Sequence, residues 1–162
     1  LTELGVTTLV PLITERSVAQ PNENAIERLE RSVIEAAKQC GRNRLMKITA
    51  PKVWEEWISQ SAIPGTLWVP KSEIEPRRLI AHPSGSPLSE LDCSQVAPTY
   101  LAVGPEGGLT DSEVATAAAA GWQTVSLGAR ILRVETAAIA LAATIALGAT
   151  PSPGTAHSND VR

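Results

Sequence analysis

Short apolar runs and stretches of helical period alternate along this chain. The runs are rich in β-forming residues and predict strands at residues 7–13, 45–51, 65–70, 77–85, 99–104 and 122–128. Between them, apolar residues recur at helical spacing and predict helices at residues 24–40, 52–61, 110–120 and 134–147. This alternation is typical of an α/β domain, so we expect a mainly parallel sheet with crossover helices.

Capping signals indicate where the helices begin and end. Asn24 and Glu27 resemble a capping box, and Gly41 stands where a C′ glycine commonly ends a helix. Thr110 and Glu113 form a second capping box, of the S/T-x-x-E type, directly after a glycine-rich stretch. We therefore expect one helix to begin near residue 24 and another to begin at residue 110.

Composition and charge limit the possible partners. A hydrophobic content of 43% in 162 residues is enough for one domain with a real core. The net charge of -3 excludes a global basic field, so nucleic acid or an anionic membrane would have to be held by a local patch. The apolar run 137–149 is shorter than the roughly 20 residues of a membrane span, and we expect it to form a buried helix.

The cysteines and histidines do not suggest a metal site or a disulfide. Cys40 and Cys93 lack CxxC spacing, and His82 and His157 have no neighbours typical of metal ligands. A reducing cytosol suits such a chain.

Three predicted strands run directly into unusual sequences. These are AHPSG at 81–85, GPEGG at 104–108 and SLGARILR at 126–133. Ligands of open α/β sheets gather at the carboxyl ends of the strands, so these three loops are expected to form one crevice.

The loop GPEGG is the strongest candidate for a binding loop. Its glycines Gly104, Gly107 and Gly108 permit positive φ and close approach of a ligand, although a tight strand-to-helix turn alone would also need glycine. The loop precedes a helix N-terminus, where free N–H groups can hold an anion. No glycine in the chain is followed by lysine, and the loop reads G-x-x-G-G, so a ligand without phosphates fits better than a nucleotide phosphate.

Several side chains near these loops have both a chemical and a structural interpretation. Glu106 is a possible general base or a carboxylate that only bonds neighbouring amides, and His82 is a possible acid or base or simply caps a strand end. Arg130 and Arg133 precede a helix, where a cation is unfavourable without a negative partner. They indicate an anionic ligand, unless they are solvated or paired with Glu135.

A local basic surface is also predicted near the N-terminus. Residues 15–17 (ERS), residues 38–42 (KQCGR) and Arg44 supply cations and hydrogen-bonding groups. The alternative is an ordinary solvated helix face.

The chain resembles the RsmE-like ribosomal-RNA methyltransferases of the SPOUT superfamily. The resemblance extends from Leu1 to about Leu147, and its motifs are LTELGV, ERS, EAAKQCGR, AHPSG, GPEGGLTDSEV and SLGARILRVETAAIAL. The family methylates uridine N3 in small-subunit (16S) ribosomal RNA with S-adenosylmethionine. The resemblance implies a homodimer and a sheet with helices on both faces that ends in a C-terminal trefoil knot, which general chain rules predict against.

The resemblance also implies a domain organisation. Residues 1–149 would form the SPOUT methyltransferase domain, and residues 150–162 have the composition of a disordered tail. The PUA-like RNA-binding domain that precedes this domain in the family is missing here, so tight RNA binding by these residues is in question. The expected location is the cytoplasm.

Specific residues receive roles by the same resemblance. The candidates for catalysis, through a base or a cation that stabilises the uracil anion, are Arg16, Glu106, Arg130 and Arg133. The RNA-binding candidates are Arg16, Arg42 and Arg44. The cofactor-binding candidates are Leu79, Ile80, Ala81, His82, Val103, Gly104, Pro105, Glu106, Gly107, Gly108, Leu109, Ser126, Leu127, Gly128, Arg130, Ile131 and Leu132.

Two other classes of function compete with the methyltransferase. One is a knotted, RNA-associated interaction module without catalytic activity. The other is a flavodoxin-like nucleotide-binding enzyme, which the missing phosphate motifs disfavour.

Overall fold

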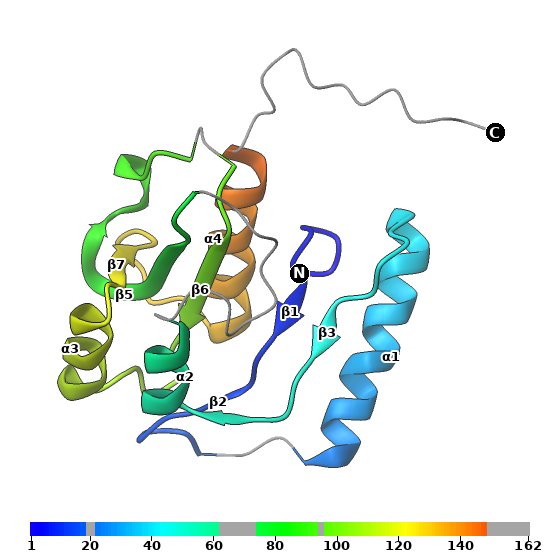
Figure 1. Cartoon of the computed structure of the whole chain (residues 1–162), viewed down its shortest axis with the longest axis horizontal. Coiled ribbons are helices and arrows are strands. Elements are labelled where there is room, and N and C mark those ends of the chain that lie inside the picture. The colour runs from blue at the N-terminus through cyan, green and yellow to red at the C-terminus, as the bar shows by residue number, and fades with distance from the viewer. Residues whose placement is uncertain (19–21, 62–73, 94–95, 149–162) are drawn as a thin grey trace.

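The computed structural model describes residues 1–18, 22–61, 74–93 and 96–148 (Figure 1). Its elements in chain order are β1 (Thr8–Leu9), β2 (Leu12–Ile13), α1 (Glu23–Cys40), β3 (Lys47–Ile48), β4 (Lys52–Val53), α2 (Trp54–Ser61), β5 (Arg77–Pro87), the 3-10 turn η1 (Leu88–Glu90), β6 (Thr99–Val103), α3 (Asp111–Ala119), β7 (Gln123–Ser126) and α4 (Val134–Gly148). The strand pairs β1–β3, β2–β4, β5–β6 and β5–β7 are all parallel, which confirms the predicted α/β class. The predicted strand 65–70 and the predicted tail 150–162 lie outside the described residues.

The first predicted strand is interrupted. Residues 7–13 were expected to form one strand, but β1 and β2 are separate and pair with β3 and β4 respectively. Pro11 lies between β1 and β2 and Pro51 lies between β3 and β4, and proline has no N–H for the ladder. The predicted helix 52–61 begins only at Trp54, because Lys52 and Val53 pair with β2.

The last three strands form the sheet that positions the candidate loops. Its strand order is β6-β5-β7, with β5 in the centre. Ile80 of β5 and Ala102 of β6 belong to a buried cluster with Trp54 of α2 and Ala117 of α3. Side chains alternate between the faces of a strand, so Leu79 and Val125 belong to a second cluster, with Leu141 of α4. Helices therefore cover both faces of this sheet, as predicted (Figure 1).

The path of β5 differs from the prediction of a strand that simply ends in a turn. After Ala81 has paired with Val125 of β7, the chain makes an excursion and returns, so that Ser86 is also opposite Val125. Gly85 lies against β7 in this excursion, and a Cβ atom on it would be only 2.5 Å from the carbonyl carbon of Thr124 and from the backbone nitrogen of Val125. This close approach of two backbones requires glycine at position 85.

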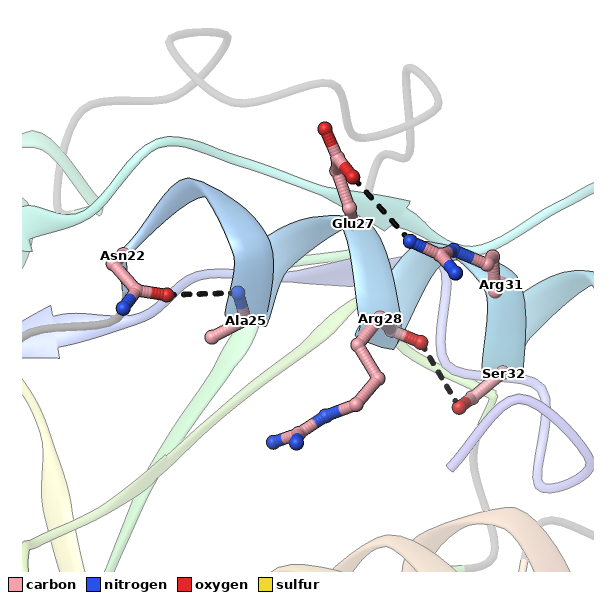
Figure 2. A network of polar contacts seen from close by, with 6 residues as sticks. All are labelled: Asn22, Ala25, Glu27, Arg28, Arg31 and Ser32. Carbon is pink, nitrogen blue, oxygen red and sulfur yellow. Dashed lines mark hydrogen bonds and ion pairs between the residues drawn. The ribbon is translucent and has the colours of Figure 1, made fainter.

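The helix caps confirm most of the predicted boundaries. Thr110 and Glu113 form the full capping box at the start of α3, and Gly41 has the left-handed conformation at the end of α1. The predicted box at Asn24 is wrong, because the N-cap of α1 is Asn22, whose side chain accepts a hydrogen bond from the Ala25 N–H at 2.9 Å (Figure 2). Asn24 lies inside the first turn, so the helix begins earlier than expected.

The described part of the chain contains no helix that is both long and apolar enough to cross a membrane. The 15-residue helix α4 has Ala137, Leu141 and Ala142 buried in the protein.

Candidate functional site

The carboxyl ends of β5, β6 and β7 meet at one edge of the sheet. Ala81 is in register with Val103 on one side and with Val125 on the other, and all three strands run in the same direction. The loops that follow these positions therefore leave the sheet together. This arrangement confirms the prediction that the three unusual sequences share one edge, which is where ligands of parallel sheets bind.

The glycine-rich loop between β6 and α3 is a compact turn. The Gly108 N–H donates to the Pro105 carbonyl at 2.8 Å, and Gly108 has φ +70°, a conformation that favours glycine. A Cβ atom on Gly104 would be 3.0 Å from Cγ of Leu109, whose side chain is buried in the cluster beneath the loop. Glu106 is exposed in this turn. Glycine is therefore needed at positions 104 and 108 for the backbone path itself.

Arg16 contacts this loop from the N-terminal part of the chain. Its guanidinium Nη1 donates to the Gly107 carbonyl at 2.9 Å. A Cβ atom on Gly107 would be 3.2 Å from Cβ of Arg16, so glycine at 107 leaves room for the arginine. The structure thus brings the predicted catalytic residue Arg16 directly onto the predicted binding loop.

A small pocket lies beside the other two loops. It has a volume of about 350 Å³ and is lined by Gly85, Pro87, Leu88, Ser89, Ser126, Leu127 and Gly128. Three of these residues, at 126–128, were predicted from the sequence. Gly85 belongs to the predicted crevice loop 81–85, but Pro87, Leu88 and Ser89 were not predicted, because they lie after the turn of β5 in a segment whose return to β7 is a tertiary feature. The SG dipeptide at 84–85 signals a turn but not this return.

His82 begins the excursion of β5. Its Nδ1 atom accepts a hydrogen bond from the Ser84 N–H at 3.3 Å and lies 2.8 Å from the Ser84 hydroxyl. Because Nδ1 is an acceptor, the neutral ring carries its proton on Nε2. His82 therefore stabilises its own turn, as the structural interpretation predicted.

The segment before α4 is strongly exposed. Arg130 and Arg133 are exposed, Leu132 is half-buried, and Ile131 is 94% exposed. The Arg133 carbonyl accepts the Ala137 N–H at 2.8 Å, which places Arg133 directly at the N-terminus of α4. Arg133 is thus a cation at a helix N-terminus, a position that indicates an anionic ligand, and Arg130 lies in the loop before it.

The basic residues assigned to RNA come from two segments of the chain. Arg16 precedes α1, whereas Arg42 and Arg44 follow it. The guanidinium of Arg42 donates to the Thr2 carbonyl at 2.8 Å, so it also anchors the first turn of the chain. That these residues share one local basic surface stays a prediction.

Glu113 is the residue at this site whose full role the sequence did not reveal. It was expected only to cap α3, but one of its carboxylate oxygens also accepts the Glu15 N–H at 2.9 Å. The signal for the cap is local, whereas the contact with Glu15 joins segments 98 residues apart.

The next features of the structure are its possible metal-binding groups and a residue whose pKa is shifted. Within the described residues, no group of three or more His, Cys, Asp or Glu side chains is arranged to hold a metal ion. Burial raises the pKa of Tyr100, and the nearby Arg78 opposes this effect. Tyr100 lies near the start of β6, at the end of the sheet opposite to the loops.

Fold and site together define a parallel α/β ligand-binding domain with a glycine-rich loop at its carboxyl edge. Residues 1–146 match the RNA methyltransferase domain family, and the chain belongs to this family. It is 42% identical over 136 residues to the ribosomal RNA small subunit methyltransferase E of Synechocystis sp., covering 84% of this chain and 43% of that protein. It is 35% identical over 145 residues to the protein of the same name from Aquifex aeolicus, covering 86% of this chain and 56% of that protein.

Solved structures give the same result. The ribosomal RNA small subunit methyltransferase E of Neisseria gonorrhoeae, bound to S-adenosyl methionine, is 32% identical with a TM-score of 0.73, and the match covers 89% of this chain and 56% of that one. A protein of Legionella pneumophila in complex with the cofactor SAM is 27% identical with a TM-score of 0.70, and the match covers 91% of this chain and 58% of that one. The chain thus spans about half the length of the relatives it matches.

Proposed function

We propose that this chain is the catalytic domain of an S-adenosylmethionine-dependent methyltransferase that modifies N3 of a uridine in 16S ribosomal RNA of the small subunit. The observation that carries the proposal is the meeting of three loops at one sheet edge, in a chain that is 32% identical to a protein solved with S-adenosyl methionine bound. The names of the relatives support ribosomal RNA of the small subunit as the substrate.

The residues at the edge fit this cofactor. The pocket of about 350 Å³ lies in the size range of small-molecule sites, and its lining of glycine, serine, proline and leucine lets a ligand approach the backbone. The residues that would hold the cofactor are the candidates named above at the carboxyl ends of β5, β6 and β7, except for Leu79 and Ile80, which are buried in the core clusters of the sheet. When bound, S-adenosylmethionine supplies a methyl group on a positively charged sulfur.

The chemistry of the substrate defines what the protein must add. Uridine N3 carries a proton that has to leave before or during attack on the methyl group, so negative charge develops on the uracil ring. The N3–H bond breaks, the N3–CH₃ bond forms, and the sulfur regains its electron pair as S-adenosylhomocysteine. The protein must accept the proton, stabilise the developing anion and hold the two reactants in line.

Arg16 is the best-supported candidate for stabilising this anion. One of its guanidinium N–H groups is held by the Gly107 carbonyl, while a guanidinium has five N–H donors in all. Glu106 is exposed on the same loop and is our candidate base. Arg130 and Arg133 are the candidates for a second cationic group beside the pocket.

Assembly and location complete the proposal. The chain would form a homodimer in the cytoplasm, with a trefoil knot in its C-terminal part and with RNA contacts from Arg16, Arg42 and Arg44.

Calorimetric titration with S-adenosylmethionine and with ATP tests the proposed cofactor. We expect binding of the former only, and we expect Gly108→Val to weaken it, because valine opposes the positive φ of the loop. Gly121→Val is the matched control, since Gly121 also has positive φ and open space but follows α3, away from the edge.

Two results would contradict the proposal. Unchanged affinity in folded Gly108→Val would exclude this loop as the cofactor site. Cofactor binding without methyl transfer to small subunits, measured in the protein at its natural length, would favour an interaction module that has lost catalysis.

A further inference from the structure

Glu113 is a buried carboxylate that joins two distant parts of the chain. Its side chain lies in the protein interior, with only 3% of the residue exposed. One oxygen accepts the Thr110 N–H at 2.8 Å and the Thr110 hydroxyl at 3.2 Å, and the other accepts the Glu15 N–H at 2.9 Å. Both oxygens are therefore used, by segments on opposite sides of the glycine-rich loop in sequence.

A capping box alone does not explain this arrangement. In a capping box the carboxylate returns to the N-cap backbone N–H, which needs one oxygen. Glu113 makes that contact and uses its second oxygen for Glu15. The Trp54 indole N–H of α2 also donates to the Glu113 carbonyl at 3.2 Å, which fixes the backbone beneath the side chain.

Glu15, whose N–H donates to Glu113, directly precedes Arg16 in the chain. Residues 14–17 form a β-turn in which the Ser17 N–H donates to the Thr14 carbonyl at 3.1 Å and the Thr14 N–H donates to the Ser17 hydroxyl at 3.0 Å. Glu113 thus holds the backbone of this turn, while the Gly107 carbonyl holds the Arg16 guanidinium.

We infer that Glu113 is a positioning residue, which holds Arg16 over the glycine-rich loop for methyl transfer. This inference rests on the proposed function. The carboxylate is stabilised by two backbone N–H groups and by its place in the first turn of α3, where the macrodipole favours negative charge. Arg16 itself is exposed in a turn, so its place depends on these two attachments.

Two variants disturb the hydrogen bond between the Glu15 N–H and the Glu113 carboxylate in different ways. Glu113→Gln keeps the shape but has a single acceptor oxygen, so either Thr110 or Glu15 loses its acceptor. Glu15→Pro removes the donor and leaves Glu113 intact, and proline is favoured at this second position of a β-turn, so the turn itself is kept. Asn22→Ala is the control, because it removes the N-cap of α1 (Figure 2) and none of the hydrogen bonds of Glu113.

Single-turnover methyl transfer to small subunits is measured in the protein at its natural length, with saturating S-adenosylmethionine. Displacing a positioned group costs about 10–100-fold in rate, and we expect a loss of this size in both variants while cofactor affinity and Asn22→Ala activity stay near the wild-type values. The losses from Glu113→Gln and from Arg16→Ala should be strongly non-additive, because one acts through the other. Additive losses, or losses no larger than that of the control, would overturn the inference.

Limited trypsin digestion gives a readout that does not depend on catalysis. Cleavage after Arg16 should be slow in the wild-type protein and in Asn22→Ala. It should be several-fold faster in Glu113→Gln and in Glu15→Pro. If the wild-type protein transfers no methyl group but the cleavage rates differ in this way, the proposed function fails, whereas the claim that Glu113 holds the turn with Arg16 stands. Equal cleavage rates in all folded variants would show that Glu113 does not hold the turn.

Discussion

Gly85 is the residue on which the path of the chain beside β7 depends. A Cβ atom there would be 2.5 Å from two backbone atoms of β7, and backbone cannot move aside as a flexible side chain can. We expect Gly85→Ala to lower the free energy of unfolding by about 3 kcal/mol, the upper part of the range for overpacked sites. Urea denaturation followed by circular dichroism measures this loss.

A matched variant separates crowding from backbone strain. Gly121 has φ +82° and open space around it, so Gly121→Ala introduces strain without a clash and should cost only about 1 kcal/mol. If Gly85→Ala is no more destabilising than Gly121→Ala, the two backbones are not in the close contact described here.

At the residue scale, local chemistry could be predicted and long-range contacts could not. Thr110 and Glu113 were predicted as a capping box because both partners lie within four residues. The hydrogen bond from the Glu15 N–H to Glu113 and the close approach of Gly85 to Thr124 depend on the folded path, and no local pattern encodes them. The misplaced cap at Asn24 has a simpler cause, since Asn22 offers the same side chain one half-turn earlier.

At the element scale, α4 has two large apolar side chains that are exposed. Leu141 is buried against the sheet, but Ile139 is 50% and Leu147 is 75% exposed. The two exposed residues lie about two turns apart, and a second copy of the chain is the partner that we propose for them. Their burial in a dimer would remove apolar area that water otherwise contacts.

Light scattering on a charge variant tests this surface. We expect the wild-type chain to have a dimer mass at micromolar concentration and Ile139→Lys to have a monomer mass while it remains folded. Ile34→Lys on α1, where the isoleucine is also partly exposed, should leave the dimer intact. A monomeric wild-type chain would rule out the homodimer, and a dimeric Ile139→Lys would place the interface elsewhere.

The elements themselves were largely predictable because their signals are local. Apolar periodicity located α1, α3 and α4 to within a few residues, and β-forming runs located β5, β6 and β7. The break between β1 and β2 follows from Pro11, because proline has no N–H to donate to the hydrogen-bond ladder of a sheet. The sequence shows this proline, but the predicted strand 7–13 runs through it.

At the scale of the whole molecule, pairing order and charge distribution decide what the chain does. The order β6-β5-β7 places three loops at one edge, although their strands are separated by long connections. A sequence pattern predicts that such strands exist but not which strands pair with each other. The rule that ligands bind at the carboxyl ends of parallel strands predicted the shared edge, and the pairing order was needed to establish it.

This charge distribution separates cofactor binding from RNA binding. With a net charge of -3, the chain has little to attract a phosphate backbone. Affinity for RNA comes mainly from lysine and arginine contacts to phosphates and falls steeply with salt, whereas binding in a pocket without charged walls is much less sensitive to salt.

We therefore expect these 162 residues to bind S-adenosylmethionine at ordinary ionic strength but to methylate small-subunit RNA poorly or not at all. The protein at its natural length should transfer the methyl group, with a rate that declines as salt rises. Arg44→Gln should lower this transfer and leave cofactor affinity unchanged. The test is methyl transfer to small subunits, measured across a salt series for the 162-residue chain and for the protein at its natural length. Equal activity of the two would mean that the RNA determinants lie within these residues, in a surface that net charge does not reveal.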